Sequence, residues 1–103
     1  MEKINLQTGM RVVLRDYTEA IILKYSYNPS EDDVYICSFR ADIKKWDYLK
    51  AYNNTLEYFI SSNQDYDIIK VYKPKHVYSI LNFFTLKGKS INNDEWDMIW
   101  SRF

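Results

Sequence analysis

The chain has 103 residues, of which 47% are apolar and 27% are charged, a composition typical of one globular domain spanning residues 1–103. Its 14 basic side chains balance its 14 acidic ones, which argues against both a strongly basic nucleic-acid-binding protein and an acidic mimic of the DNA backbone. No apolar run approaches the length of about 18 residues that a membrane span needs. We therefore expect a cytoplasmic protein with no membrane contact.

Residues that usually carry chemistry are scarce in this chain, which has one cysteine, one histidine and two glycines. A single cysteine excludes an internal disulfide and a cysteine zinc cage, and two isolated glycines exclude a glycine-rich phosphate loop. Nothing in the sequence links His76 to Cys37 or to a serine as a catalytic base. We predict no catalytic residue, no metal site and no cofactor. The protein is expected to bind another macromolecule rather than to be an enzyme.

The first third of the chain predicts a β-hairpin. Residues 10–15 and 19–27 are rich in β-branched side chains, which favours two strands joined by a tight turn at residues 16–18. Pro29 and the acidic run at residues 31–33 then mark a loop.

Further strands are expected at residues 34–40, at residues 66–72 and, more briefly, at residues 47–51. The last segment, residues 96–102, predicts a final strand. Its side chains Trp96, Met98 and Trp100 recur at period two and are expected to share one face.

Between these strands, residues 74–86 predict one helix. Pro74 suits a first turn, where its missing N–H is no loss. Val77, Ile80, Leu81 and Phe84 recur at i, i+3, i+4 and i+7, which indicates a single apolar stripe.

The order of these elements predicts an α+β fold. We expect a small, strongly bent antiparallel sheet or SH3-like partial barrel of five to six strands, with one helix near residues 74–86. Such bending hides sheet edges in a short chain.

Aromatic and acidic side chains are the candidates for partner contact, because tyrosine and tryptophan dominate interface hot spots. Tyr17 occupies a turn position where glycine would be expected, so its ring should project outward. The full set of candidate partner-binding residues is Tyr17, Tyr25, Tyr27, Glu31, Asp32, Asp33, Tyr48, Tyr52 and Tyr58.

A nucleic-acid interface is the alternative and would use Lys70, Lys73 and Lys75. Single-strand binders combine cations with stacking aromatics, and Lys70 points the same way as Tyr72 on a strand. Lys73 and Lys75 are expected instead in the following loop and helix start. Few cations give only a modest electrostatic contribution.

The segment from Leu6 to Asp16 resembles the start of small proteins found in phages and prophages of low-GC Gram-positive bacteria. The segments from Asp65 to Pro74 and from Trp96 to Arg102 resemble the closing strands of that group. Tyr17 stands where the group often has glycine. The resemblance implies an SH3-like barrel and a phage origin, and it transfers no functional residue.

Some anti-CRISPR proteins come from such gene neighbourhoods. The leading hypothesis is therefore a phage-encoded protein that binds and occludes a host defence protein, most sharply a Cas effector. Its acidic loops would complement a basic nucleic-acid channel of that partner. The alternatives are a nucleic-acid-binding SH3-like module and a small virion or assembly component.

Overall fold

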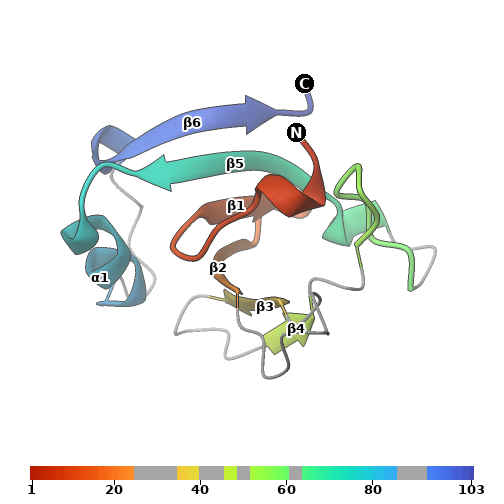
Figure 1. Ribbon diagram of the computed structural model, residues 1–103, viewed down its shortest axis with the longest axis horizontal. Helices are drawn as coiled ribbons and strands as arrows, with labels where there is room; N and C mark the ends of the chain where they lie inside the picture. Colours follow the sequence, from red (N-terminus) through yellow and green to blue (C-terminus); the bar gives the residue numbers. More distant parts are fainter. Residues whose placement is uncertain (25–34, 40–45, 49–51, 61–63, 86–92) are drawn as a thin grey trace.

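The computed structural model describes residues 1–24, 35–39, 46–48, 52–60, 64–85 and 93–103 (Figure 1). Its main elements are β1 (Arg11–Leu14), β2 (Glu19–Lys24), β3 (Tyr35–Phe39), β4 (Trp46–Tyr48), β5 (Ile68–Pro74), α1 (Val77–Thr85) and β6 (Trp96–Ser101). Within the same ranges they are accompanied by the short 3-10 turns η1 (Lys3–Asn5), η3 (Gln64–Tyr66) and η4 (Asn93–Glu95). Within these ranges no helix has the length and apolar character needed to cross a membrane.

The strands form one antiparallel sheet in the order β4-β3-β2-β1-β5-β6. Figure 1 shows the sheet bending from β5 and β6 at the top to β3 and β4 at the bottom. The helix α1 lies at one end of the sheet, where β5 finishes. The expected small α+β class is confirmed.

The β1–β2 turn folds as the sequence predicts. The Leu14 N–H donates to the Thr18 carbonyl at 2.8 Å, and the Tyr17 N–H donates to the Leu14 carbonyl at 2.8 Å. The Asp16 carboxylate accepts from the Thr18 N–H at 2.9 Å. Tyr17 has a φ of 67°, the left-handed conformation that this type of hairpin loop requires and that glycine adopts most easily.

Two apolar clusters lie on opposite faces of the sheet, because successive side chains of a strand alternate. Ile22 belongs to the larger cluster and Ile21 to the smaller one. The larger cluster contains Leu6, Met10, Val12, Leu14, Ala20, Ile22, Tyr52, Leu56, Ile68 and Val71. The smaller cluster contains Ile21, Phe83 and Trp96, with Tyr72 and Ile80 packed against it.

The expectation that Trp96, Met98 and Trp100 share one face is wrong. Met98 pairs with Tyr72, whereas Trp100 pairs with Val71. Ile99 is therefore an extra residue, a β-bulge that reverses the alternation. Trp96 consequently joins the smaller cluster, and Trp100 packs against the larger one.

The expectation that Pro74 opens the helix is also wrong. Pro74 is the last residue of β5 and pairs with Trp96 of β6. The pairing continues beyond the strand, since the Lys75 N–H donates to the Glu95 carbonyl at 3.0 Å. Proline is tolerated there because the end of a strand can dispense with its N–H. The helix begins at Val77.

Only part of the predicted apolar stripe of α1 faces the sheet. Ser79 and Phe83 are buried, whereas Val77 and Leu81 are 65% and 54% exposed. The helix is thus rotated by about one residue, roughly 100°, from the expected orientation. The Ser79 hydroxyl fixes this rotation by donating to the Glu95 carbonyl at 2.8 Å. The Phe84 side chain lies outside the described part of the structure.

Arg11 lies in the middle of the sheet face that α1 covers, and its side chain is 1% exposed. Its guanidinium carbon lies 4.0 Å from the Tyr72 ring centre and 4.9 Å from the Trp96 ring centre. The Nη2 atom donates to the Asn93 side-chain oxygen at 2.7 Å, and Nε lies 3.5 Å from a Glu19 carboxylate oxygen. Burial lowers the pKa of Arg11, while the Glu19 carboxylate raises it. One cation thereby joins β1, β2, β5, β6 and η4.

We predict that Arg11→Ala lowers the free energy of unfolding by about 3 kcal/mol, because it removes the packing of two rings and leaves Asn93 without its donor. Urea unfolding followed by tryptophan fluorescence measures this change. Lys75→Ala is the matched control. The Lys75 side chain is 46% exposed and its partner Asp97 is 60% exposed, so its loss should cost about 1 kcal/mol or less. Equal losses in the two variants would contradict the central role of Arg11.

Candidate protein-binding surface at the β1–β2 turn

Among the predicted contact residues whose side chains the structure describes, Tyr17 is the most exposed, at 79%. Tyr58 is half-buried, and Tyr52 is only 2% exposed. Tyr48 lies in β4, with its side chain outside the described part of the chain. The remaining predicted contacts fall outside the described residues: Tyr25, Tyr27, Glu31, Asp32 and Asp33.

Tyr52 and Tyr58 pack with a third ring, Tyr66. The Tyr58 ring centre lies 5.4 Å from that of Tyr52 and 5.2 Å from that of Tyr66, both in edge-to-face geometry. The Tyr52 hydroxyl donates to the Tyr66 carbonyl at 2.8 Å. Such pairs stabilise a fold beyond their buried area. These tyrosines therefore stabilise the fold, and we do not include them in the proposed binding surface.

The turn that carries Tyr17 is fixed to the segment before β5. The Asp16 N–H donates to the Asp65 carbonyl at 3.0 Å, and the Arg15 N–H donates to the Asp67 carbonyl at 2.8 Å. The Asp16 and Asp65 side chains are both exposed. The turn that carries Tyr17 and the segment bonded to it therefore each hold an exposed carboxylate, although the sequence separates the two by 49 positions.

Arg15 has its own acidic partner in the same region. Its Nη2 lies 3.5 Å from an Asp67 carboxylate oxygen, and its guanidinium carbon lies 5.4 Å from the Phe103 ring centre. Phe103 is 79% exposed, and Asp67 is buried at 4%. We call Arg15, Asp16, Tyr17, Asp65 and Phe103 the turn surface.

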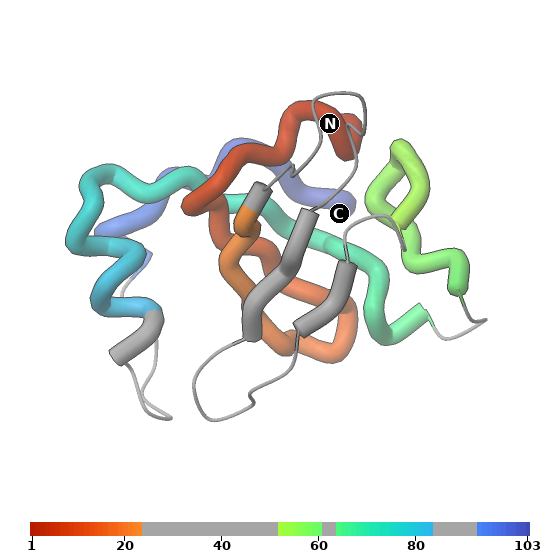
Figure 2. The backbone as a smooth tube through the Cα atoms, turned by 60° about the horizontal axis from the view of Figure 1, so that its bottom comes forward, coloured from red at the N-terminus to blue at the C-terminus, as the bar shows by residue number. Residues whose placement is uncertain are grey.

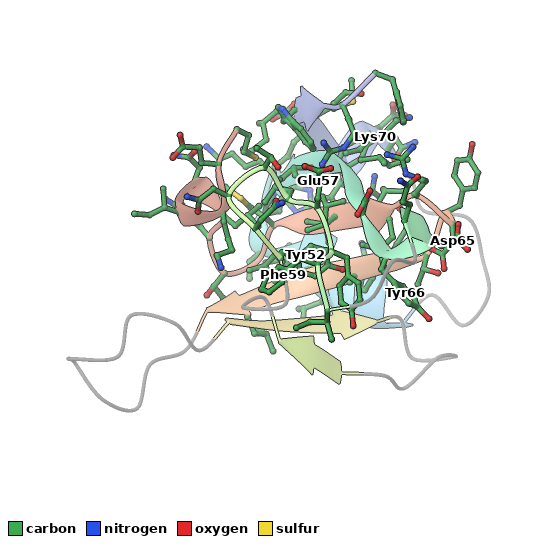
Figure 3. The ribbon with its side chains drawn as sticks, turned by 90° about the vertical axis from the view of Figure 1, so that its right-hand side faces the viewer. Tyr52, Glu57, Phe59, Asp65, Tyr66 and Lys70 are labelled. Carbon is green, nitrogen blue, oxygen red and sulfur yellow. The ribbon has the colours of Figure 1, made fainter. Side chains whose placement is uncertain are left out.

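Another carboxylate, Glu57, lies on the same end of the molecule as Asp65, the end that Figure 3 faces. The Thr55 hydroxyl donates to Glu57 at 2.6 Å. This hydrogen bond is the main cause that lowers the pKa of Glu57, and Asn53, Arg102 and Arg15 lower it further. Glu57 therefore stays ionised at neutral pH, with the cations Arg102 and Arg15 near its carboxylate.

The three candidate lysines do not converge on one face. Lys70 and Lys73 are three positions apart on β5 and therefore point to opposite sides of the sheet. The expectation that Lys73 lies in a loop or helix start is wrong, because the pairing of β5 with β6 extends past it. The Lys75 Nζ lies 3.9 Å from an Asp97 carboxylate oxygen.

His76 is exposed and its ring centre lies 6.0 Å from that of Tyr78. Among the residues that the structure describes, no three His, Cys, Asp or Glu side chains come together in a way that could hold a metal ion.

Comparison of the chain with protein-family models gives no match, and no curated protein or solved structure is significantly similar to it. The resemblance of residues 6–16 to phage proteins stays a prediction.

Sequence reasoning identified Tyr17 but did not single out Asp16, Asp65 or Phe103. The turn pattern alone is enough to place Tyr17 at the surface. Asp65 reaches the turn through the pairing of β1 with β5, and Phe103 reaches Arg15 because β6 pairs with β5; no local pattern reveals either.

We predict that Tyr17→Gly leaves the free energy of unfolding unchanged or raises it by up to about 1 kcal/mol. Glycine adopts a φ of 67° without strain, although it also gains freedom in the unfolded chain. Tyr17→Val should lower stability by about 1 kcal/mol, because a β-branched side chain is strained there. Urea unfolding of both variants is the measurement. A loss above about 1 kcal/mol for Tyr17→Gly would show that the ring stabilises the fold.

Proposed function

We propose that the protein binds another protein through the turn surface and blocks it by steric occlusion. The observation that carries this proposal is the combination of strain and exposure at Tyr17, which has a left-handed φ of 67° and a ring that is 79% exposed. A bulky residue held in this conformation costs about 1–2 kcal/mol that glycine would not. A solvent-exposed ring offers little packing in return, so a contact with a partner best accounts for it.

The charges of the turn surface indicate the chemistry of the partner. Exposed Asp16 and Asp65 flank the aromatic residue, and ionised Glu57 lies on the same end. The charge of Arg15 is offset by Asp67. An aromatic anchor with an acidic rim complements a basic protein surface, which favours association and fixes its orientation.

A basic groove that normally holds nucleic acid is the partner surface that fits this chemistry best. Together with the resemblance to phage proteins, this supports a phage-encoded inhibitor of a host defence protein in the host cytoplasm. In the most specific form of this proposal the partner is a Cas effector, and the protein is an anti-CRISPR inhibitor. For the fold, the bending of the sheet in Figure 1 supports an SH3-like partial barrel as the finer description.

We predict that Tyr17→Gly weakens partner binding by about 30-fold or more while the fold remains intact, because hot-spot aromatic residues contribute about 2 kcal/mol or more. The experiment is affinity capture from host lysate with the wild-type protein, followed by titration of the captured partner. Phe59→Gly is the matched control, since Phe59 is 57% exposed and lies outside the turn surface.

Four outcomes test the proposal. Binding that weakens with added salt and is lost with Asp16→Lys supports the acidic rim. Equal capture of the partner by the wild-type protein and by Tyr17→Gly would show that the turn surface is not the binding site. Binding of DNA or RNA by the purified chain, unaffected by Tyr17→Gly, would establish the nucleic-acid alternative instead. Failure of the gene to restore phage plating on a CRISPR-positive host would remove the anti-CRISPR version alone.

A further inference from the structure

The helix α1 is attached to the sheet by few buried side chains. Among its side chains that the structure describes, Ser79 and Phe83 are buried, and Ile80 is half-buried against the smaller cluster. Val77 and Leu81 are 65% and 54% exposed, although both belong to the predicted apolar stripe. Because the buried apolar area sets how firmly an element is held, packing holds α1 only weakly.

Glu95, at the start of β6, receives hydrogen bonds from α1. The Ser79 hydroxyl donates to the Glu95 carbonyl at 2.8 Å, and the Asn82 amide donates to both Glu95 carboxylate oxygens, at 3.1 and 3.2 Å. Asn82 is exposed, so water can replace its bonds at little cost. Release of the helix therefore costs mainly the Ser79 bond and the burial of Phe83.

The larger cluster does not depend on α1. In the described part of the chain its buried members come from β1, β2, β5 and the segments 6–10 and 52–56, with none from α1. It lies on the other face of the sheet, since Ile22 belongs to the larger cluster and Ile21 to the smaller one. The six-stranded sheet can therefore stay folded when α1 leaves it.

Arg11 lies beneath the helix with two of its hydrogen-bond donors unsatisfied. Its Nε and Nη1 atoms are buried, and no residue that the structure describes accepts a hydrogen bond from either. Glu19 balances the charge at 3.5 Å from Nε, and Tyr72 offers the face of its ring at 4.0 Å, but neither contact has hydrogen-bonding geometry. Buried donors without acceptors lose their hydration and gain nothing in exchange. Exposure of Arg11 to water would remove this cost.

We propose that α1 is a lid on this face of the sheet. In the closed form it covers Arg11, Tyr72 and Trp96. In the open form the helix moves away as a unit, the sheet stays folded, and the guanidinium between the two rings becomes accessible to solvent and solutes. The lid thus controls access to a charge that the closed form buries.

The position of α1 suits such a movement. The Lys75 N–H is still paired with the Glu95 carbonyl, and the helix begins at Val77, so the hinge on the β5 side is His76. Figures 1 and 2 show α1 at one end of the molecule, beyond the end of β5. The helix can leave from there without displacing a strand.

The lid is separate from the turn surface. Arg11 begins β1 and the turn follows its last residue, Leu14, so the four residues of this strand place about 13 Å between the two. Opening of α1 leaves the hydrogen bonds of Arg15 and Asp16 to residues 65–67 in place.

We predict that the amides of residues 81–83, inside α1, exchange hydrogen about 30-fold or more faster than those of β1 and β2, each relative to an unfolded chain. Ile22→Val tests how α1 opens. Ile22 stays buried in the larger cluster whether the lid is open or closed, so this variant should speed exchange in β1 and β2 by about 5-fold and leave exchange in α1 unchanged. Amide hydrogen exchange followed by NMR is the measurement.

Phe83→Leu is the matched variant beneath the lid. It weakens the closed form against both the open form and the unfolded chain, so it should speed exchange in α1 and in the strands alike, by about 5-fold. If Ile22→Val speeds exchange in α1 as much as in β1 and β2, the helix opens only when the whole domain unfolds, and the proposal is overturned.

Chemical modification tests whether the lid covers Arg11. Phenylglyoxal, which reacts with guanidinium groups, should modify Arg11 in native buffer at a rate that Phe83→Leu raises by about 5-fold and Ile22→Val leaves unchanged. Arg15, whose side chain is 34% exposed, is the internal control. Peptide mass spectrometry at low extent of reaction measures both sites. Modification of Arg15 without any modification of Arg11 would contradict the lid. None of these outcomes bears on the turn surface, which Tyr17→Gly tests separately.

Discussion

The stacking of the Arg11 guanidinium between Tyr72 and Trp96 is the interaction on which the arrangement of this fold depends. Among the side chains that the structure describes, the smaller apolar cluster has three buried members, Ile21, Phe83 and Trp96. Arg11 extends that cluster with its aliphatic stem and offers its charge to two aromatic faces. Desolvation of the cation is costly, as the lowered pKa of Arg11 shows, and the rings and Glu19 offset that cost. A charged residue thus takes the place of an apolar one in the packing of this small domain.

The position of the helix follows from this use of the sheet face. Arg11, Tyr72 and Trp96 already cover its centre, and of the α1 side chains that the structure describes, only Ser79 and Phe83 are fully buried. The bond from Ser79 to the Glu95 carbonyl then anchors the helix at the start of β6. The apolar residues beyond this arc have no place on the sheet and face solvent. The exposure of Val77, Tyr78 and Leu81 is therefore a consequence of how the opposite side of the helix is packed.

Local patterns predict most of the strands but not how their faces are used. β-Branched runs located β1, β2, β3 and β5, and a turn pattern located Tyr17, because both signals are contained within a few residues. Three features depend on distant partners instead. The bulge at Ile99 reverses the face of Trp100, the β5–β6 pairing keeps Pro74 in a strand, and Arg11 is buried by rings far away in sequence. Periodicity assumes that alternation is unbroken and that cations face water, so it could reveal none of these.

At the candidate site, the turn itself is encoded locally, whereas the contacts that hold it come from residues distant in sequence. A tyrosine keeps a left-handed backbone conformation only where the surrounding structure holds that backbone in place by several interactions. Here the ladder from β1 to β5 holds Arg15 and Asp16 against residues 65–67, and Asp67 also anchors the Tyr58 N–H and the Arg15 side chain. The strain at Tyr17 is thus supported by the interior of the domain. The ring itself is left exposed among acidic neighbours, where its large area can be used by a partner.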